Sequence, residues 1–329
     1  MDNSIQRPIV HPLIVVPFGI LAVSTASIFI RFIQAESVSS LVIAALRLTL
    51  AAVILSPFAL SRNRHELVSL NRKDAFLAVL SGILLAVHFA TWITSLEYTS
   101  VASSVVFVST SPLWVALIAP IAIKENVPRG VLFGMLIALV GGVIIGISDS
   151  CELQINTFKA LGRNADLLTN SKYLYCPPYN QFVGGDVFFG DCLALAGAIS
   201  GAGYILFGRK LREKMTLLPY IFVVYGISAV VLIIVMFVSG ASPYGYSPRV
   251  YYLIILLAVV PQLIGHSTIN WSLRYLSAAY VSITLLGEPI GSAILAYIFL
   301  SEVPSGLMIF GAILILLGIF ITSRRNRYN

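Results

Sequence analysis

The sequence predicts an all-α polytopic membrane protein: ten transmembrane helices arranged as two inverted five-helix repeats, with both termini in the cytoplasm. Three observations support this prediction. The 329 residues are 58% hydrophobic and only 11% charged, whereas soluble domains carry about 25% charged residues. The apolar residues fall into successive windows of roughly 20, the length that a hydrocarbon layer about 30 Å thick requires. The second half of the chain also aligns with the first.

Ten apolar windows follow one another along the chain. We expect membrane helices at residues 12–33, 39–60, 74–96, 101–122, 130–149, 187–208, 217–239, 251–272, 278–300 and 305–323. A transmembrane barrel does not fit, because barrel strands are segments of about 10 residues with alternating polarity. The first window is longer than the apolar core of a typical signal peptide, so we expect it to be retained.

Basic residues are distributed unequally between the two sides of the membrane. If the N-terminus is inside, the internal segments hold most of the 21 Lys and Arg residues. This asymmetry follows the positive-inside rule and predicts cytoplasmic termini. The net charge of +7 is therefore explained by orientation, and we expect no nucleic-acid partner. In the absence of a recognisable transit segment or retention tail, we expect the cell membrane (inner or plasma membrane) to be the location.

The two halves of the sequence repeat one another. The stretch SLEYTSVASSVVFVSTSPLWVALIAPIAIKENV aligns without a gap on SLRYLSAAYVSITLLGEPIGSAILAYIFLSEVP, so that Pro112 meets Pro289. Because each repeat holds an odd number of spans, the second copy must enter the membrane from the opposite side. Inverted repeats of this kind build alternating-access carriers with a substrate site near mid-membrane. We predict a first repeat at 1–149, an external loop or insertion at 150–186 and a second repeat at 187–329.

The predicted external loop contains two cysteines, Cys151 and Cys176. An oxidising exterior would allow a disulfide between them, and two free thiols are equally compatible with the sequence. The loop either covers an outer vestibule or is a tolerated surface insertion. Cys192, inside the sixth window, is expected to be a small packed residue.

Polar side chains recur at helical spacing inside several windows. His88, Thr91 and Trp92 share one face of the third window, and Gln262, His266 and Asn270 repeat every four residues in the eighth. Polar faces avoid lipid and should point inward toward a common space, although single hydroxyls also serve as hydrogen bonds between helices. The predicted cavity residues are Ser24, Ser27, His88, Thr91, Trp92, Ser111, Ser200, Tyr204, Gln262, His266, Asn270, Thr284 and Glu288. Two histidines without Cys or acidic companions at ligand spacing do not predict a metal site, and no cofactor is expected.

Two prolines and two charged residues lie deep in predicted spans. Pro112 and Pro289 each remove a backbone donor and should break the fourth and ninth helices, which is tolerated where the break lines a cavity. Glu288 could bind a cationic group, exchange a proton during transport, or be a permanently paired structural acid. Arg47 keeps its charge, so it must find carbonyls, a carboxylate, water or an anionic ligand. One hypothesis pairs it with Glu288, and the other has it reach water or the headgroups by snorkelling.

Two long stretches of the sequence resemble the drug/metabolite transporter superfamily, specifically its EamA-type ten-span exporters. They are HFATWITSLEYTSVASSVVFVSTSPLWVAL and PQLIGHSTINWSLRYLSAAYVSITLLGEPIGSAILAYIFLSE, and Arg47 with the following LTLAA is similar to the family's second-span motif. The resemblance covers nearly the whole chain except the loop at 150–186. It implies a basket of ten helices around a central cavity, and export of small metabolites such as amino acids, sugars or nucleotide-related compounds.

The function expected from these observations is secondary transport. No G-x-x-x-x-G-K-[ST] loop is present, so we expect no direct ATP hydrolysis. The prediction is an exporter of small polar or amphipathic, amino-acid-like metabolites that rocks one five-helix half against the other, with proton coupling through Glu288 as a hypothesis. Its partners would be a small-molecule substrate and the lipid bilayer, while the sequence leaves the oligomeric state open. An intramembrane enzyme or a non-transporting scaffold is the alternative, and neither G-x-S-x-G nor H-E-x-x-H occurs to support an enzyme.

Overall fold

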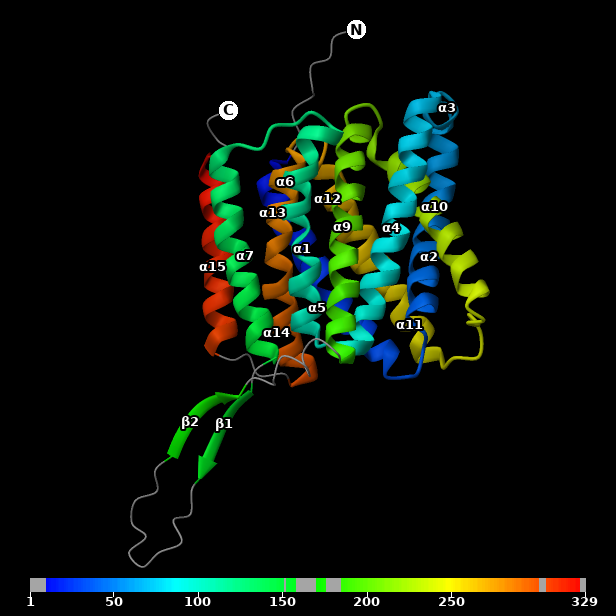
Figure 1. Ribbon diagram of the computed structural model, residues 1–329. Helices are drawn as coiled ribbons and strands as arrows, with labels where there is room; N and C mark the ends of the chain where they lie inside the picture. Colours follow the sequence, from blue (N-terminus) through cyan, green and yellow to red (C-terminus); the bar gives the residue numbers. More distant parts are fainter. Residues whose placement is uncertain (1–9, 151, 158–169, 176–184, 302–305, 326–329) are drawn as a thin grey trace, which may run out of the picture.

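The computed structural model describes residues 10–150, 152–157, 170–175, 185–301 and 306–325. Its main body is a bundle of helices that run roughly along one common axis (Figure 1). Each predicted apolar window is helical. Eight helical segments are long and apolar enough to cross a membrane, and two shorter apolar stretches, Arg129–Ile144 and Ile309–Gly318, lie in the remaining long helices.

The described residues up to Ser150 form seven helices, two of which share the predicted fourth window. They are α1 (Pro12–Gln34), α2 (Ser40–Arg62), α3 (Arg64–Val68), α4 (Arg72–Tyr98), α5 (Val101–Val108), α6 (Ser111–Ala122) and α7 (Arg129–Ser150).

The second half begins with α9 (Asp186–Arg212) and α10 (Leu217–Val238), and two of its later spans are interrupted. The eighth window is composed of α11 (Pro248–Leu257), a π-helical segment (Ala258–His266) and α12 (Ser267–Ser272). The ninth is composed of α13 (Ala278–Thr284), a 3-10 turn (Leu285–Gly287) and α14 (Glu288–Leu300), and the chain continues into α15 (Gly306–Arg325).

An antiparallel hairpin lies between the two halves, with β1 (Glu152–Thr157) paired to β2 (Asn170–Tyr175). It projects from the end of the bundle where α7 ends and α9 begins (Figure 1). The sequence prediction did not include this hairpin, and the all-α prediction is confirmed for the described helical body. Cys151 and Cys176, the proposed disulfide partners, lie outside the described residues.

The breaks in the fourth and ninth spans occur where the sequence places proline. Pro112 lies in the first turn of α6 and Pro289 in the first turn of α14, where a missing N–H is tolerated. Serines also fix the starts of the preceding helices: the Ser100 and Ser277 hydroxyls accept hydrogen bonds from the backbone N–H groups of Ser103 and Tyr280. These serines are equivalent in the two repeats, so the repeats share their local stop and start signals.

Helices from the two halves interleave. In one group, which we call the larger body, α4 packs on α9, α10 packs on α2 and α4, and α1 packs on the π-helical segment that follows α11. In the other group, the smaller body, α7 packs on α15, and α5 and α6 pack on α14 and α13. Figure 1 shows α7, α15, α13 and α14 on one side and α4, α2, α10 and α11 on the other. The sequence repeats are therefore interleaved and are not separate bodies.

Glycine allows the closest helix contact of the smaller body. A Cβ atom on Gly141 of α7 would lie 2.5 Å from the backbone oxygen of Gly311 in α15. A Cβ on Gly318 of α15 would likewise collide with the backbone oxygen of Gly134 in α7. Small residues of this kind let membrane helices approach until their backbones touch.

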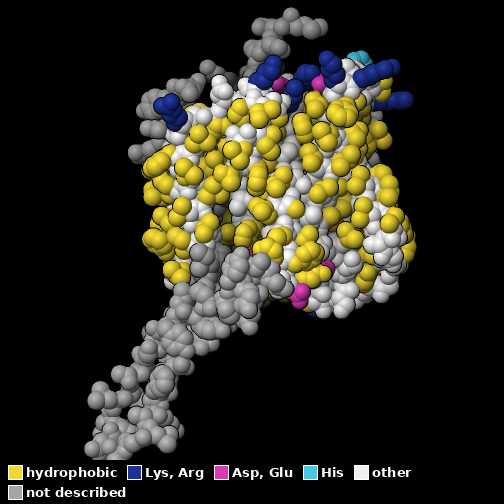
Figure 2. Space-filling view, in the orientation of Figure 1, with side chains coloured by type: hydrophobic (Ala, Val, Ile, Leu, Met, Phe, Trp, Pro, Cys, Tyr) yellow, Lys and Arg dark blue, Asp and Glu magenta, His cyan; other side chains and the backbone are white. Residues whose placement is uncertain are grey.

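The surface has an apolar middle and one strongly basic end. Figure 2 shows hydrophobic side chains over the middle of the bundle and Lys and Arg side chains gathered at the end where α3 lies. Large apolar side chains such as Phe18, Ile121 and Val238 are 68%, 86% and 84% exposed. An exposed apolar surface of this extent is unfavourable in water and suits a lipid environment.

Candidate functional site

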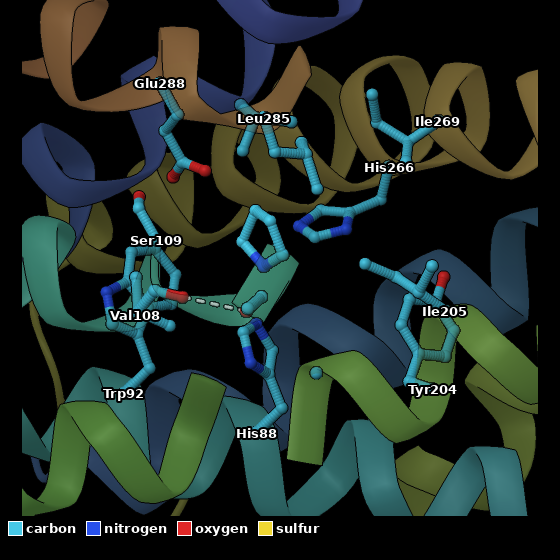
Figure 3. Close-up of a pocket in the computed structure, with 14 residues that line it drawn as sticks. His88, Trp92, Val108, Ser109, Tyr204, Ile205, His266, Ile269, Leu285 and Glu288 are labelled. Atoms are coloured by element: carbon cyan, nitrogen blue, oxygen red, sulfur yellow. Dashed lines mark hydrogen bonds between the residues drawn. The ribbon is translucent and has the colours of Figure 1, made fainter. Parts of the chain in front are cut away.

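A cavity lies where the larger and smaller bodies meet. The larger body contributes α1, α4, α9 and the segment from His266 into α12, and the smaller body contributes the two proline-broken spans. The residues predicted from sequence that line it are His88, Trp92, Ser111, Tyr204, His266 and Glu288, together with Pro112. Figure 3 shows His88, Trp92, Tyr204 and His266 of the larger body and Glu288 of the smaller body around this cavity.

Glu288 is the first residue of α14, directly before Pro289. Its carboxylate points into the cavity (Figure 3) and accepts no hydrogen bond from any residue that the structure describes. The N-terminus of a helix carries a partial positive charge, which favours a carboxylate at this position. Glu288 therefore offers the cavity a free hydrogen-bond acceptor.

His88 faces the cavity from α4 with a defined proton position. Its Nδ1 atom lies 2.8 Å from the backbone oxygen of Gly197 in α9. Because a carbonyl only accepts hydrogen bonds, Nδ1 must donate, and Nε2 of the neutral ring is left as an acceptor. Trp92 stacks on the ring at a centroid distance of 6.1 Å. Gly201 leaves room for the ring, since a Cβ there would lie 2.9 Å from the Nδ1 atom.

Tyr204 shapes the cavity wall, but its hydroxyl is already in use. The hydroxyl donates to Oδ1 of Asn270 at 2.8 Å, and Nδ2 of Asn270 lies 3.2 Å from the hydroxyl of Tyr225. Asn270 is fully buried behind Tyr204. The prediction that Asn270 lines the cavity is therefore wrong in this structure, and its role is to fix the tyrosine.

Arg47 lies behind the cavity wall and is fully buried. Its Nε donates to Oε1 of Gln262 at 2.9 Å, and its guanidinium carbon lies 4.1 Å from the centroid of the Phe89 ring. The Phe89 ring also meets His266 edge-on at 5.3 Å, which connects Arg47 to the cavity wall.

Both sequence hypotheses for Arg47 were wrong in this structure. Complete burial excludes snorkelling to the headgroups. The ion pairs within 4.0 Å among the described residues do not include one between Arg47 and Glu288. Both Nη atoms of Arg47 and Nε2 of Gln262 also lack a hydrogen-bond partner in the described part of the chain, so Gln262 serves the arginine and does not line the cavity.

The remaining predicted cavity residues do not line the cavity. Most of their hydroxyl groups are taken up by backbone oxygens of their own helices, which is the ordinary way a membrane helix satisfies serine and threonine. These bonds are Ser24 to Ile20, Thr91 to Val87, Ser200 to Ala196 and Thr284 to Val281, while Ser27 is buried without a partner among the described residues.

Sequence reasoning missed three polar residues of interest and misplaced one cysteine. Ser109 lines the cavity just before the break at Pro112, and Asp191 and Arg212 are buried charges of α9. An acidic residue within the sixth apolar window was a signal that could have identified Asp191. Cys192 is exposed, so its expected packing inside the protein was wrong.

Comparison with known proteins agrees with this architecture. Residues 13–147 and 188–324 each match the model of the EamA-like transporter family. The chain belongs to this family.

Several transporters are similar to this EamA-like chain along most of their length. An uncharacterized transporter of Archaeoglobus fulgidus is 23% identical over 250 residues, which are 75% of this chain and 74% of the relative. The uncharacterized transporter YyaM of Bacillus subtilis is 24% identical, over 78% and 77% of the two chains. The pseudopaline exporter CntI of Pseudomonas aeruginosa is 20% identical, over 80% of each. A solved crystal structure superposes with a TM-score of 0.68 over 97% of this chain and 99% of its own, at 14% identity, and this likeness shows the fold alone.

Proposed function

We propose that this EamA-like transporter is an ATP-independent exporter of small, amphipathic, amino-acid-like metabolites that carry a cationic amine. The observation that carries the proposal is the carboxylate of Glu288, which faces the central cavity without a hydrogen-bond partner among the described residues. A carboxylate deep in a membrane protein is costly and usually marks a transport path. A substrate ammonium group would satisfy it.

The rest of the cavity wall supports an amine-bearing and partly apolar substrate. Nε2 of His88 is an acceptor because Nδ1 donates to Gly197. Apolar side chains such as Val23, Ile205 and Leu285 complete the wall and suit a hydrocarbon or aromatic portion of the substrate. An ammonium donates hydrogen bonds and accepts none, so it matches acceptors at both Glu288 and His88.

In the proposed topology, ten spans form two inverted repeats at 1–149 and 187–329. The end of the bundle where Lys and Arg side chains gather (Figure 2) faces the cytoplasm, following the positive-inside rule. Both chain termini lie on that side, and the segment 150–186 with its hairpin lies outside. The cell membrane is the proposed location, and the export direction is supported by the similarity to the exporter CntI.

The experiment begins with ligand-induced stabilisation of the purified protein, because a ligand that binds the folded state raises its stability. The probes are amino acids, their decarboxylated amines, organic cations, nucleosides and uncharged sugars, and the hits are followed as flux in proteoliposomes. Glu288→Gln keeps the shape of the side chain and removes its charge. A hydrogen bond to a charged group contributes about 1.5–3 kcal/mol, so affinity for cationic hits should fall about 10- to 150-fold.

Glu36→Gln is the matched control, because Glu36 pairs with Arg249 away from the cavity. It should leave binding and flux unchanged. Flux of uncharged sugars that persists in Glu288→Gln, with no response to amines, would reject the amine assignment and leave a transporter. An absence of flux for every probe would reject transport itself. Flux driven by an imposed pH gradient in the wild type and lost in Glu288→Gln is the result expected for proton coupling.

A further inference from the structure

The larger and smaller bodies meet mainly where α1 crosses α14 and where α9 crosses α5 and α6, and α9 also contacts α13 while α4 contacts α5. Both crossings are joined by hydrogen bonds midway along the helices. At the first, the Ser292 hydroxyl donates to the backbone oxygen of Ser24 at 3.2 Å, and the Ser24 hydroxyl, which donates to Ile20 of its own helix at 2.9 Å, also lies 3.3 Å from the backbone oxygen of Glu288. At the second, the Ser111 hydroxyl, which donates to the backbone oxygen of Val108 at 2.8 Å, also lies 3.2 Å from the backbone oxygen of Ala198. These contacts lie at the level of the cavity.

The crossing of α9 is also joined near the end where the hairpin emerges. Asp191, in the second turn of α9, is only 6% exposed, and its Oδ1 accepts a hydrogen bond from the Ser103 hydroxyl of α5 at 3.0 Å. A buried carboxylate depends on such a donor, because an unpaired charge is strongly disfavoured away from water. Separating α5 from α9 at this end would break the bond.

At the basic end, α9 is joined to the smaller body by charge. Arg209 lies 3.7 Å from Glu125, which follows α6. Arg209 is held in place within the larger body, because its Nη1 donates to the backbone oxygen of Leu273 at 2.8 Å.

The other described ion pairs stay within one body. Lys214 pairs with Asp74 of α4, and Arg249 pairs with Glu36 between α1 and α2. Glu213 pairs with Arg209 on consecutive turns at the end of α9. Among the ion pairs of the described residues, Arg209–Glu125 is therefore the one that crosses between the bodies.

We propose that Ser103–Asp191 and Glu125–Arg209 are the two gate contacts of this protein, and that they break alternately while the mid-level serine contacts act as the pivot. The two gate residues of α9 are 18 positions apart, which corresponds to about 27 Å along a helix, so they lie toward opposite ends of the transport path. Opening at the basic end separates Glu125 from Arg209, and opening at the other end separates Ser103 from Asp191. This inference rests on the proposed transport function.

The test measures access to the cavity from each side and needs no substrate. In a background of Cys151→Ser, Cys176→Ser and Cys192→Ser, the cavity carries a single thiol through Ser109→Cys. A membrane-impermeant thiol reagent is added to vesicles of either orientation. Glu125→Lys places like charges together and should raise the ratio of labelling from the basic side to labelling from the opposite side. Ser103→Ala should lower the same ratio. A change of one or two kcal/mol in the free-energy difference between the two open states changes the ratio of their populations by a factor of about 5 to 30.

Glu66→Lys is the control at the basic end, because Glu66 accepts its hydrogen bonds from Thr216, within the larger body. Glu36→Lys is the control at the opposite end. Both should leave the ratio unchanged, and Arg209→Glu combined with Glu125→Lys should restore it toward the wild-type value. Asp191→Asn, with its weaker acceptor, should shift the ratio in the same direction as Ser103→Ala.

Three results would overturn the gate assignment: shifts in the same direction for Glu125→Lys and Ser103→Ala, equal shifts in the controls, or no labelling of folded protein from either side in any variant. Opposite shifts without flux of any probe would retain the gates and reject the proposed transport function. Flux of an amine together with unmoved labelling ratios would retain that function and reject the gates.

Discussion

Replacing Arg47 with lysine tests whether the geometry of the buried guanidinium, and not only its charge, stabilises the larger body. Lysine keeps the positive charge but loses the planar group that donates to Gln262 at 2.9 Å and lies 4.1 Å from the Phe89 ring centroid. A hydrogen bond to a charged group contributes about 1.5–3 kcal/mol, and a buried cation–π contact about 0.5–2 kcal/mol. Because the lysine ammonium can still make part of both interactions, we expect Arg47→Lys to lower the free energy of unfolding by about 2 kcal/mol.

The assay is denaturant unfolding in detergent micelles, followed by tryptophan fluorescence. Arg249→Lys is the control, because Arg249 is 67% exposed and should change stability by less than about 0.5 kcal/mol. A double-mutant cycle with Gln262→Leu should show coupling of about 1 kcal/mol, since each change removes the same bond. An Arg47→Lys protein as stable as the wild type, or strictly additive losses in the cycle, would refute the assigned role of Gln262.

Two further predictions concern His88 and the contact at the basic end. Gly201→Ala should destabilise the protein by about 1–3 kcal/mol and weaken ligand-induced stabilisation, because the added Cβ displaces the His88 ring from Gly197. Gly226→Ala is the control for the melting measurements, because a Cβ there meets nothing within 4 Å. Burial raises the pKa of the Glu125 carboxyl above its ordinary 4.5, although Arg209 opposes the shift. The contact state therefore binds the proton more tightly than an open, hydrated state, and lowering the pH toward 4.5 should lower the ratio of thiol labelling from the basic side to labelling from the opposite side. An unchanged pH dependence in Glu125→Gln would contradict this assignment.

The sequence predicted the positions of the helices and of the two proline breaks because each depends on local properties. Hydropathy over about 20 residues locates a span, and a proline has the same effect on a helix wherever it lies. His88, Trp92 and His266 were identified for a related reason. A large polar side chain within an apolar window is unfavourable next to lipid, so it is expected to face the interior of the bundle. Ser200 and Thr284 share the same spacing signal, yet their hydroxyls bond to their own helices. Periodicity does not separate these two outcomes.

Tertiary arrangement explains the predictions that were wrong. The π-helical segment Ala258–His266 winds more loosely than an α-helix, so the face on which Gln262 lies does not follow from a spacing of four. The hydrogen bond between Arg47 and Gln262 could therefore not be predicted from the sequence. Alignment of the repeats identified equivalent residues such as Pro112 and Pro289, but equivalence does not say which helices pack together. The grouping of α4 with α9 and of α7 with α15 appears only in three dimensions.

The glycine contact between α7 and α15 ties the two copies of the repeat to each other. Gly141 lies against the backbone of Gly311, and Gly318 lies against the backbone of Gly134. Each helix therefore has one glycine whose missing side chain leaves room for the backbone of the other helix. One residue inserted between Gly134 and Gly141 would turn one of these glycines away by about 100° and leave a side chain facing a backbone with no room for it. A matching insertion in α15 would be needed to restore the fit. At this point the duplicated segments can change length only together.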